Sequence, residues 1–123
     1  MDRRTAREEA FKLLFQHEIN TVEEINSEKL DPFTKKIVLG VIDKKEEIDQ
    51  LISNHLKNWS YERVALVEKT VLRIAVFEIT YLDDIPIGVS INEAVELSHT
   101  YGDEKSGKFV NGVLSNIIEQ KES

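Results

Sequence analysis

The 123-residue sequence has no cysteine, only two prolines and no long apolar run. Without cysteine, structural disulfides and thiolate-bound zinc are both excluded. A membrane-spanning helix needs roughly 20 consecutive apolar residues, and no stretch of the chain provides them. The N-terminal segment is interrupted by charges, which excludes a signal peptide. We therefore expect a cytoplasmic protein that neither crosses a membrane nor depends on disulfides.

Acidic residues outnumber basic ones by 23 to 16, which gives a formal net charge of −7. Broad, non-specific binding to nucleic acid is driven by neutralisation of phosphates, and an acidic protein is unsuited to it. Any nucleic-acid site must therefore be a local basic patch. The composition, 41% hydrophobic and 32% charged, is that of an ordinary globular protein. We expect one domain over residues 1–123.

Apolar residues recur at helical spacing along most of the chain, and this pattern predicts an all-α fold. The predicted helices span residues 3–19, 32 to about 57, 64–81, 90–101 and 106–119. The helix at 64–81 is apolar nearly all round, so we expect other helices to cover it on several faces. Asp31 and Pro32 form a typical helix start, with an N-cap followed by proline at the first position.

Several single residues predict local geometry. Ser60 is a candidate N-cap for the central helix, and Ser90 with Glu93 has the spacing of a capping box. Gly102 suits a left-handed position after a helix. Gly112 costs its helix about 1 kcal/mol against alanine, which the close approach of another helix would offset.

The sequence contains no recognisable catalytic arrangement. His17, His55 and His99 lie in different predicted helices, without the short spacing of a metal-binding pair. P-loops, glycine-rich dinucleotide turns and serine nucleophile elbows are absent. No nucleophile, base and oxyanion site can be assembled from motifs. We expect a non-enzymatic binding protein with no catalytic residue, metal or cofactor.

Glu68 lies among apolar positions of the central helix, where an unpaired buried carboxylate would cost several kcal/mol. It must reach the surface, pair internally with an arginine such as Arg73 or Arg63, or meet a binding partner. Trp59 and Tyr61 lie in the turn before that helix. An isolated aromatic residue is more often packed than used as a base-stacking platform, so we expect both to cover the core.

Two cationic segments stand near opposite ends of the chain. Arg3, Arg4 and Arg7 open the first helix, where positive charge opposes the helix dipole. A solvated mixed-charge face and a binding site both explain such a cluster. Lys105, Lys108 and Phe109 open the last helix, and lysines with an aromatic face suit phosphates and unstacked bases.

Taken together, these segments resemble a known family. The matching stretches are RRTARE at 3–8, VEKTVLRIA at 67–75, INEAVEL at 91–97, YG at 101–102 and KFVNGVL at 108–114. In this order and over nearly the whole chain, they resemble the NusB family of bacterial transcription antitermination factors. The sequence departs from some members at Thr5, which interrupts an arginine run, and at Lys105, which replaces an acidic residue.

The resemblance implies a compact bundle of two packed three-helix halves. It further implies binding to single-stranded boxA RNA of nascent ribosomal transcripts together with NusE, a protein of the small ribosomal subunit. The pair would help to assemble an antitermination complex with NusA, NusG and RNA polymerase. The residues that would contact RNA are Arg3, Arg4, Arg7, Lys105, Lys108 and Phe109; those that would contact NusE are Phe15 and Glu68.

Two other functions remain compatible with the sequence. NusB-like domains also occur as N-terminal modules of RNA methyltransferases, but we expect no catalytic domain here because the chain ends at Ser123 without a methyl-donor glycine motif. A helical protein–protein scaffold is the second alternative. It includes a homodimer of the free protein that covers the arginine-bearing face.

Overall fold

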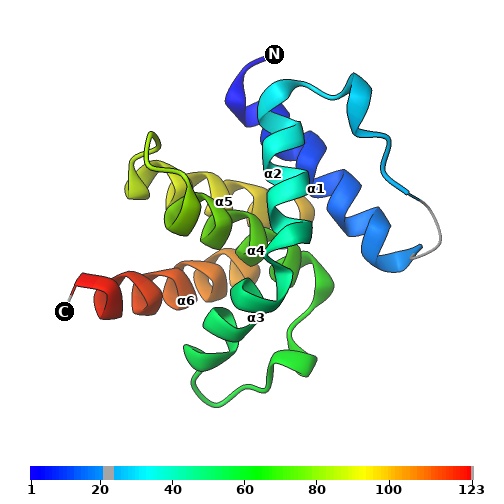
Figure 1. Ribbon diagram of the computed structural model, residues 1–123. Helices are drawn as coiled ribbons and strands as arrows, with labels where there is room; N and C mark the ends of the chain where they lie inside the picture. Colours follow the sequence, from blue (N-terminus) through cyan, green and yellow to red (C-terminus); the bar gives the residue numbers. More distant parts are fainter. Residues whose placement is uncertain (21–23, 123) are drawn as a thin grey trace.

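The computed structural model describes residues 1–20 and 24–122 (Figure 1). In these residues the fold is all-α, with six α-helices, two short 3-10 turns and no strand, as the apolar spacing predicts. The helices are α1 (Arg3–Ile19), α2 (Pro32–Asp43), α3 (Lys45–Asn54), α4 (Leu66–Tyr81), α5 (Ile87–Tyr101) and α6 (Glu104–Glu122). The 3-10 turns are η1 (Ser27–Lys29) and η2 (Tyr61–Arg63). No helix in the described part of the chain is both long and apolar enough to cross a membrane.

The predicted central helix is confirmed as α4. Every residue from Thr70 to Ile79 is buried, and α4 packs against all five other α-helices. The helices form two halves, α1–α3 and α4–α6, with α5 and α6 side by side in the second half (Figure 1). Because α4 belongs to the second half and also contacts all three helices of the first, its apolar surface forms the centre of a single core.

The single helix predicted from residue 32 to about 57 is wrong, because the chain bends at Lys44. There φ is −103° and ψ is 16°, and α2 ends on one side while α3 begins on the other. The bend allows α2 to pack on α1 and α4 while α3 packs on α4 and α6. The apolar repeat continues through it since both helices turn apolar residues toward α4. The helix start at Asp31 is confirmed, with its carboxylate accepting from the Phe33 amide at 3.1 Å.

Three of the predicted caps, Ser60, Ser90 and Gly102, are wrong. Ser60 precedes η2, and α4 begins later with Ala65 in the N-cap position and no side-chain cap. Ser90 lies inside α5, which begins at Ile87 directly after Pro86. The chain therefore enters α5 four residues earlier than the capping-box pattern indicates, because Pro86 and not Ser90 is the N-cap, and the Ser90 hydroxyl is available for a contact in the core. Gly102 ends α5 with φ −120°, not in the left-handed region.

The close helix approach predicted at Gly112 is found instead at Gly107. A Cβ at Gly112 would meet nothing within 4 Å, whereas one at Gly107 would lie 2.3 Å from His99 Nε2. Glycine at 107 thus allows α5 and α6 to pack closely. The start of α6 is also earlier than predicted, because Asp103 accepts from the Ser106 amide at 2.8 Å and caps the first turn.

The loop between α3 and α4 holds the two aromatic residues predicted to cover the core. Tyr61 is half-buried, packs against the core and donates its hydroxyl to Asp49 at 2.5 Å. The prediction for Trp59 is wrong, because its side chain is 57% exposed. Asn58, immediately before it, has φ 67°, a left-handed conformation that asparagine tolerates. The chain turns at this point, and the indole remains on the surface.

Candidate nucleic-acid interface

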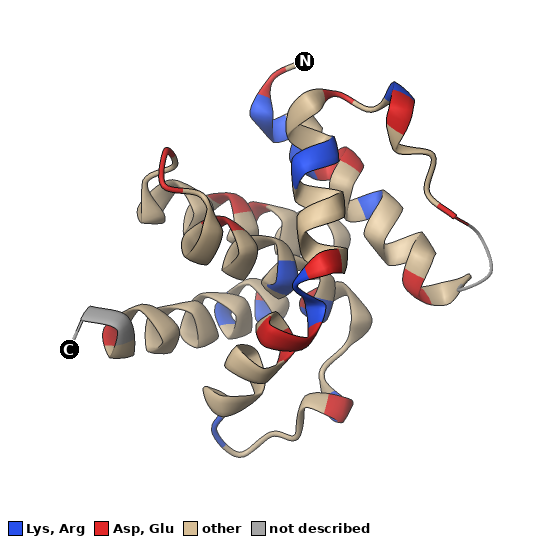
Figure 2. Cartoon of the chain, in the orientation of Figure 1, with Lys and Arg blue, Asp and Glu red and all other residues tan. Residues whose placement is uncertain are grey.

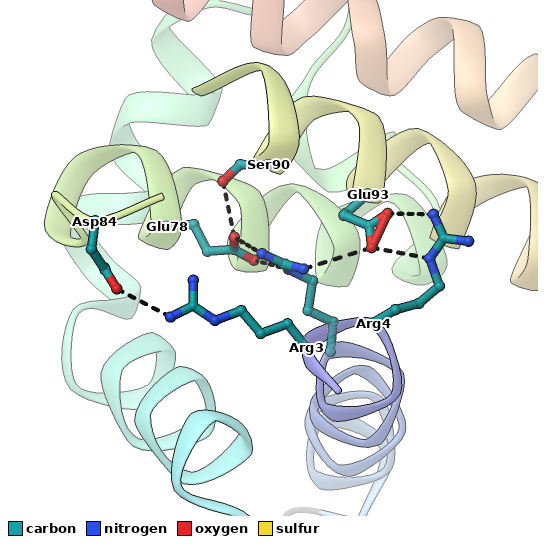
Figure 3. Close-up of polar contacts among 7 residues, drawn as sticks. Arg3, Arg4, Glu78, Asp84, Ser90 and Glu93 are labelled. Carbon is teal, nitrogen blue, oxygen red and sulfur yellow. Dashed lines mark hydrogen bonds and ion pairs between the residues drawn. The ribbon is translucent and has the colours of Figure 1, made fainter. Parts of the chain in front are cut away.

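The first turn of α1 carries two exposed arginines that are both paired with distant carboxylates (Figure 3). Arg3 donates to Asp84, on the loop between α4 and α5, at 3.1 Å. Arg4 makes a two-pronged contact with Glu93 of α5, with donor–acceptor distances of 3.1 and 2.8 Å. Each guanidinium is therefore already paired with a carboxylate of the same chain.

Arg7, the third arginine, is buried and only 3% exposed. Its Nε and Nη2 both donate to the carboxylate of Glu78 at 2.8 Å, and its Nη1 lies 3.6 Å from Glu93. Ser90 donates to the same Glu78 carboxylate at 2.9 Å. Glu78 is itself only 1% exposed, so the arginine compensates a charge in the core. This placement argues against a direct contact between Arg7 and an external ligand.

The ion pairs of the first turn shift the acids toward their charged forms. The hydrogen bond from Arg4 lowers the pKa of Glu93, although partial burial opposes the shift. The hydrogen bond from Arg3 likewise lowers the pKa of Asp84. Both carboxylates are therefore ionised at neutral pH, and each neutralises the arginine beside it.

The start of α6 presents the second cationic segment. Lys105 and Lys108 are exposed, and Phe109 is half-buried against the core. Lys108 lines an open groove of about 540 Å³ together with Arg4, and α5 forms its floor. The structure thus brings the starts of α1 and α6 together, as the RNA hypothesis requires. Glu96 and Glu104 line the same groove, so the cations do not form one unbroken ribbon (Figure 2).

The two residues expected at a protein interface lie on α1 and α4. Phe15 is half-buried and stacks on Phe11 with ring centroids 5.7 Å apart. Glu68 is half-buried in the first turn of α4. Arg73 donates to Asp49 at 2.8 Å and is not the internal partner of Glu68. Among the described residues Glu68 has no ion pair, which leaves solvent or a binding partner.

Sequence reasoning missed the acids that hold the arginines. Asp84, Glu78 and Glu93 lie 71 to 89 residues away from their partners along the chain. The spacing of residues along the sequence cannot predict ion pairs between residues that are so far apart in the chain. One signal was present: Glu78 is a second carboxylate within the apolar central helix, and a buried carboxylate requires a partner.

The described residues offer no grouping of three or more His, Asp or Glu side chains that could hold a metal ion. The described residues form an all-helical bundle with cations at two neighbouring helix starts, which places the chain among small all-helical proteins. A sequence model described as the NusB family matches residues 4–119, and the chain belongs to this family.

Similar proteins agree with this assignment. The transcription antitermination protein NusB of Oceanobacillus iheyensis is 55% identical over 125 residues, covering 96% of this chain and 99% of the relative. The structure of NusB from T. maritima superposes with a TM-score of 0.86 at 39% identity, covering 98% and 92% of the two chains. A crystal structure of NusB and NusE in complex with double-stranded RNA gives a TM-score of 0.83 at 33% identity, covering 96% of each chain.

Proposed function

We propose that this chain is a non-enzymatic adaptor of transcription antitermination that binds boxA RNA together with NusE. In this proposal the RNA is a single-stranded segment of a nascent ribosomal transcript. The pair helps to assemble NusA, NusG and RNA polymerase into an antitermination complex. Membership of the NusB family and the match to a NusB chain solved with NusE and RNA support the proposal.

The observation that carries the RNA assignment is the groove shared by Arg4 and Lys108. These residues are 104 positions apart in the sequence, and they line one surface because α1 and α6 both border α5 there. Lysine and arginine side chains bind phosphates, and the half-buried Phe109 offers part of an aromatic face beside them. A single-stranded RNA has both phosphates and unstacked bases to offer such a surface.

We assign direct RNA contacts to Arg3, Arg4, Lys105, Lys108 and Phe109. Arg7 keeps a role at the same site, but an indirect one. Its guanidinium is held by Glu78 and lies 3.6 Å from Glu93, the acid that also positions Arg4. Arg7 therefore acts indirectly, because it helps to position Glu93, which in turn positions Arg4 for contact with RNA.

We assign the NusE contact to Phe15 and Glu68. Phe15 leaves part of its ring accessible while its other face packs on Phe11. Glu68 has no ion pair among the described residues, so a cationic side chain of a partner can meet it without displacing an internal one. Glu68→Lys is expected to weaken NusE binding with little change in melting temperature. Unfolding of that variant would instead assign Glu68 to the internal structure.

RNA binding with and without NusE tests the proposal. Fluorescence anisotropy of labelled boxA RNA is measured at several salt concentrations for wild type, Arg4→Ala with Lys108→Ala, and Lys29→Ala. The double variant removes both cations of the groove, and the control removes an exposed lysine of η1, which lies away from α6 in Figure 1. We expect NusE to strengthen binding to wild type.

The double variant is expected to bind more weakly, with a salt slope reduced by up to about 0.7 per lost phosphate contact. The control should match wild type. Absence of RNA binding at low salt, with or without NusE, would favour a protein–protein scaffold. We further propose that the free protein forms a homodimer. Its molar mass in solution, measured by light scattering, tests this.

A further inference from the structure

Beside the proposed RNA surface lies an exposed aromatic residue that neither the fold nor the proposed contacts explain. Trp59 is the only tryptophan in the sequence, and more than half of its side chain faces solvent. Its ring packs against that of Phe109 in a T-shaped arrangement, with a centroid distance of 6.3 Å and an interplanar angle of 70°. Phe109 belongs to α6 and packs on the core, so the indole rests against a fixed neighbour.

We propose that Trp59 is a stacking platform for an unpaired RNA base, so that the RNA surface continues from α6 onto the loop between α3 and α4. This inference rests on the proposed function and extends it to residues outside the two cationic segments. The ligand class is single-stranded RNA, whose bases present free faces. An indole face provides a large area for stacking, and base–aromatic stacking tolerates any base.

The position of the indole supports a binding role over a role in folding. Burying a tryptophan removes a large apolar area from water, and a chain selected for stability alone gains most by doing so. Here the neighbouring Tyr61 is packed against the core while Trp59 is not. The left-handed backbone at Asn58 turns the chain immediately before Trp59.

Cations on both sides of the aromatic pair match the charge of an RNA backbone. Lys108 precedes Phe109 on α6, and Lys57 lies two residues before Trp59; both lysines are exposed. Lys57 lines a second groove, of about 390 Å³, together with Asn116 and Glu119 of α6. A strand that leaves the first groove at Lys108 therefore meets aromatic faces and then a further lysine.

Because Trp59 is the only tryptophan, fluorescence excited at the long-wavelength edge of its absorption, where the three tyrosines do not absorb, reports on this side chain alone in the free protein. The complex with NusE is titrated with boxA-containing single-stranded RNA and, separately, with the same sequence annealed into a duplex. The identical titration of the Trp59→Ala complex is subtracted to remove any signal from NusE. We expect the single strand to quench Trp59 and the duplex to leave it nearly unchanged, because paired bases have no free face.

Three variants separate stacking from charge. Trp59→Ala is expected to weaken RNA binding by about fivefold or more without changing the salt slope, since stacking neutralises no phosphate. Trp59→Phe should retain part of the affinity. Lys57→Ala should instead reduce the salt slope. Melting temperatures of all three should stay near that of wild type, because the replaced side chains are exposed.

The outcomes distinguish this inference from the proposed function. If RNA binds the wild-type complex, Trp59→Ala binds it equally well and no quenching is seen, the stacking role of Trp59 is wrong and the proposed adaptor function is unaffected. If RNA does not bind the wild-type complex at all, the proposed function is wrong, and the stacking role of Trp59 that rests on it is wrong as well. Quenching by NusE in the absence of RNA, with weaker NusE binding by Trp59→Ala, would assign Trp59 to a protein contact and overturn the platform.

Discussion

The starts of α1 and α6 carry cations at equivalent positions of a helix, yet the two segments differ in what those cations contact. Arg3, Arg4 and Arg7 all pair with carboxylates of distant elements. Lys105 and Lys108 have no ion pair within the described residues and extend into solvent. A count of positive charges in the sequence treats the two segments alike. The structure shows that, among the described residues, only the α6 lysines are without an ion pair, although Glu96 and Glu104 line the same groove.

This difference has a direct consequence for binding. A phosphate that approaches Arg3 or Arg4 must displace Asp84 or Glu93, and one exposed ion pair is then exchanged for another with little net gain. A phosphate that approaches Lys108 displaces only water and counterions. We therefore expect the lysines to supply more of the electrostatic affinity, and the arginines to supply orientation.

The largest effect is expected from Arg7→Ala. Removing this guanidinium leaves the Glu78 carboxylate buried and uncompensated, which costs about 3–5 kcal/mol. Arg3→Ala serves as the matched control, because its side chain is 53% exposed and its loss should leave unfolding nearly unchanged. Urea denaturation of both variants measures the difference. An Arg7→Ala variant as stable as wild type but weak in RNA binding would show that Arg7 contacts the ligand directly.

The next effect compares the two segments in RNA binding. Lys108→Ala is expected to reduce the salt slope of RNA affinity by about 0.7, the value for one lost phosphate contact on a single strand. Arg4→Ala should reduce it by less, since Glu93 already neutralises that guanidinium. Anisotropy titrations with boxA RNA and NusE at four salt concentrations measure both slopes. Equal losses would show that the Glu93 contact opens completely when RNA binds.

A gain of function is expected when the competing acid is neutralised. Glu93→Gln keeps a hydrogen-bond acceptor beside Arg4 but removes the charge, so RNA affinity should rise by up to about fivefold. Glu96→Gln is the matched control, because Glu96 lies on the same helix and lines the same groove without a hydrogen bond to Arg4. Equal gains in both variants would indicate a general effect of net charge and not the release of Arg4.

Much of the fold follows from local pattern, and the parts that do not have identifiable reasons. The apolar central helix and the start at Asp31 depend on neighbours in the sequence, and both are confirmed. The bend at Lys44 depends on which helices α2 and α3 pack against, and the apolar repeat is the same with or without it. The exposure of Trp59 likewise depends on the direction of a turn, which residue type alone does not determine.

For the candidate site, the sequence predicted which cations to consider but not their surroundings. The groove that joins Arg4 to Lys108 exists because two helices far apart in sequence meet at α5. The carboxylates beside the arginines arrive from α4, α5 and the loop between them. Charge patterning along one helix cannot show pairing across the fold, and the availability of a cation depends on that pairing.

The smallest effect concerns the pH dependence of stability. The hydrogen bond from Arg4 lowers the pKa of Glu93 below its ordinary value of 4.5. A carboxylate with a depressed folded-state pKa stabilises the fold above its unfolded pKa, and loses that contribution as pH falls through the folded value. The melting-temperature difference between wild type and Glu93→Gln should therefore be present at pH 7 and shrink by pH 3. Glu96→Gln should show a smaller difference. A Glu93→Gln difference that stays constant across this range would mean that the Arg4 contact does not stabilise the folded protein.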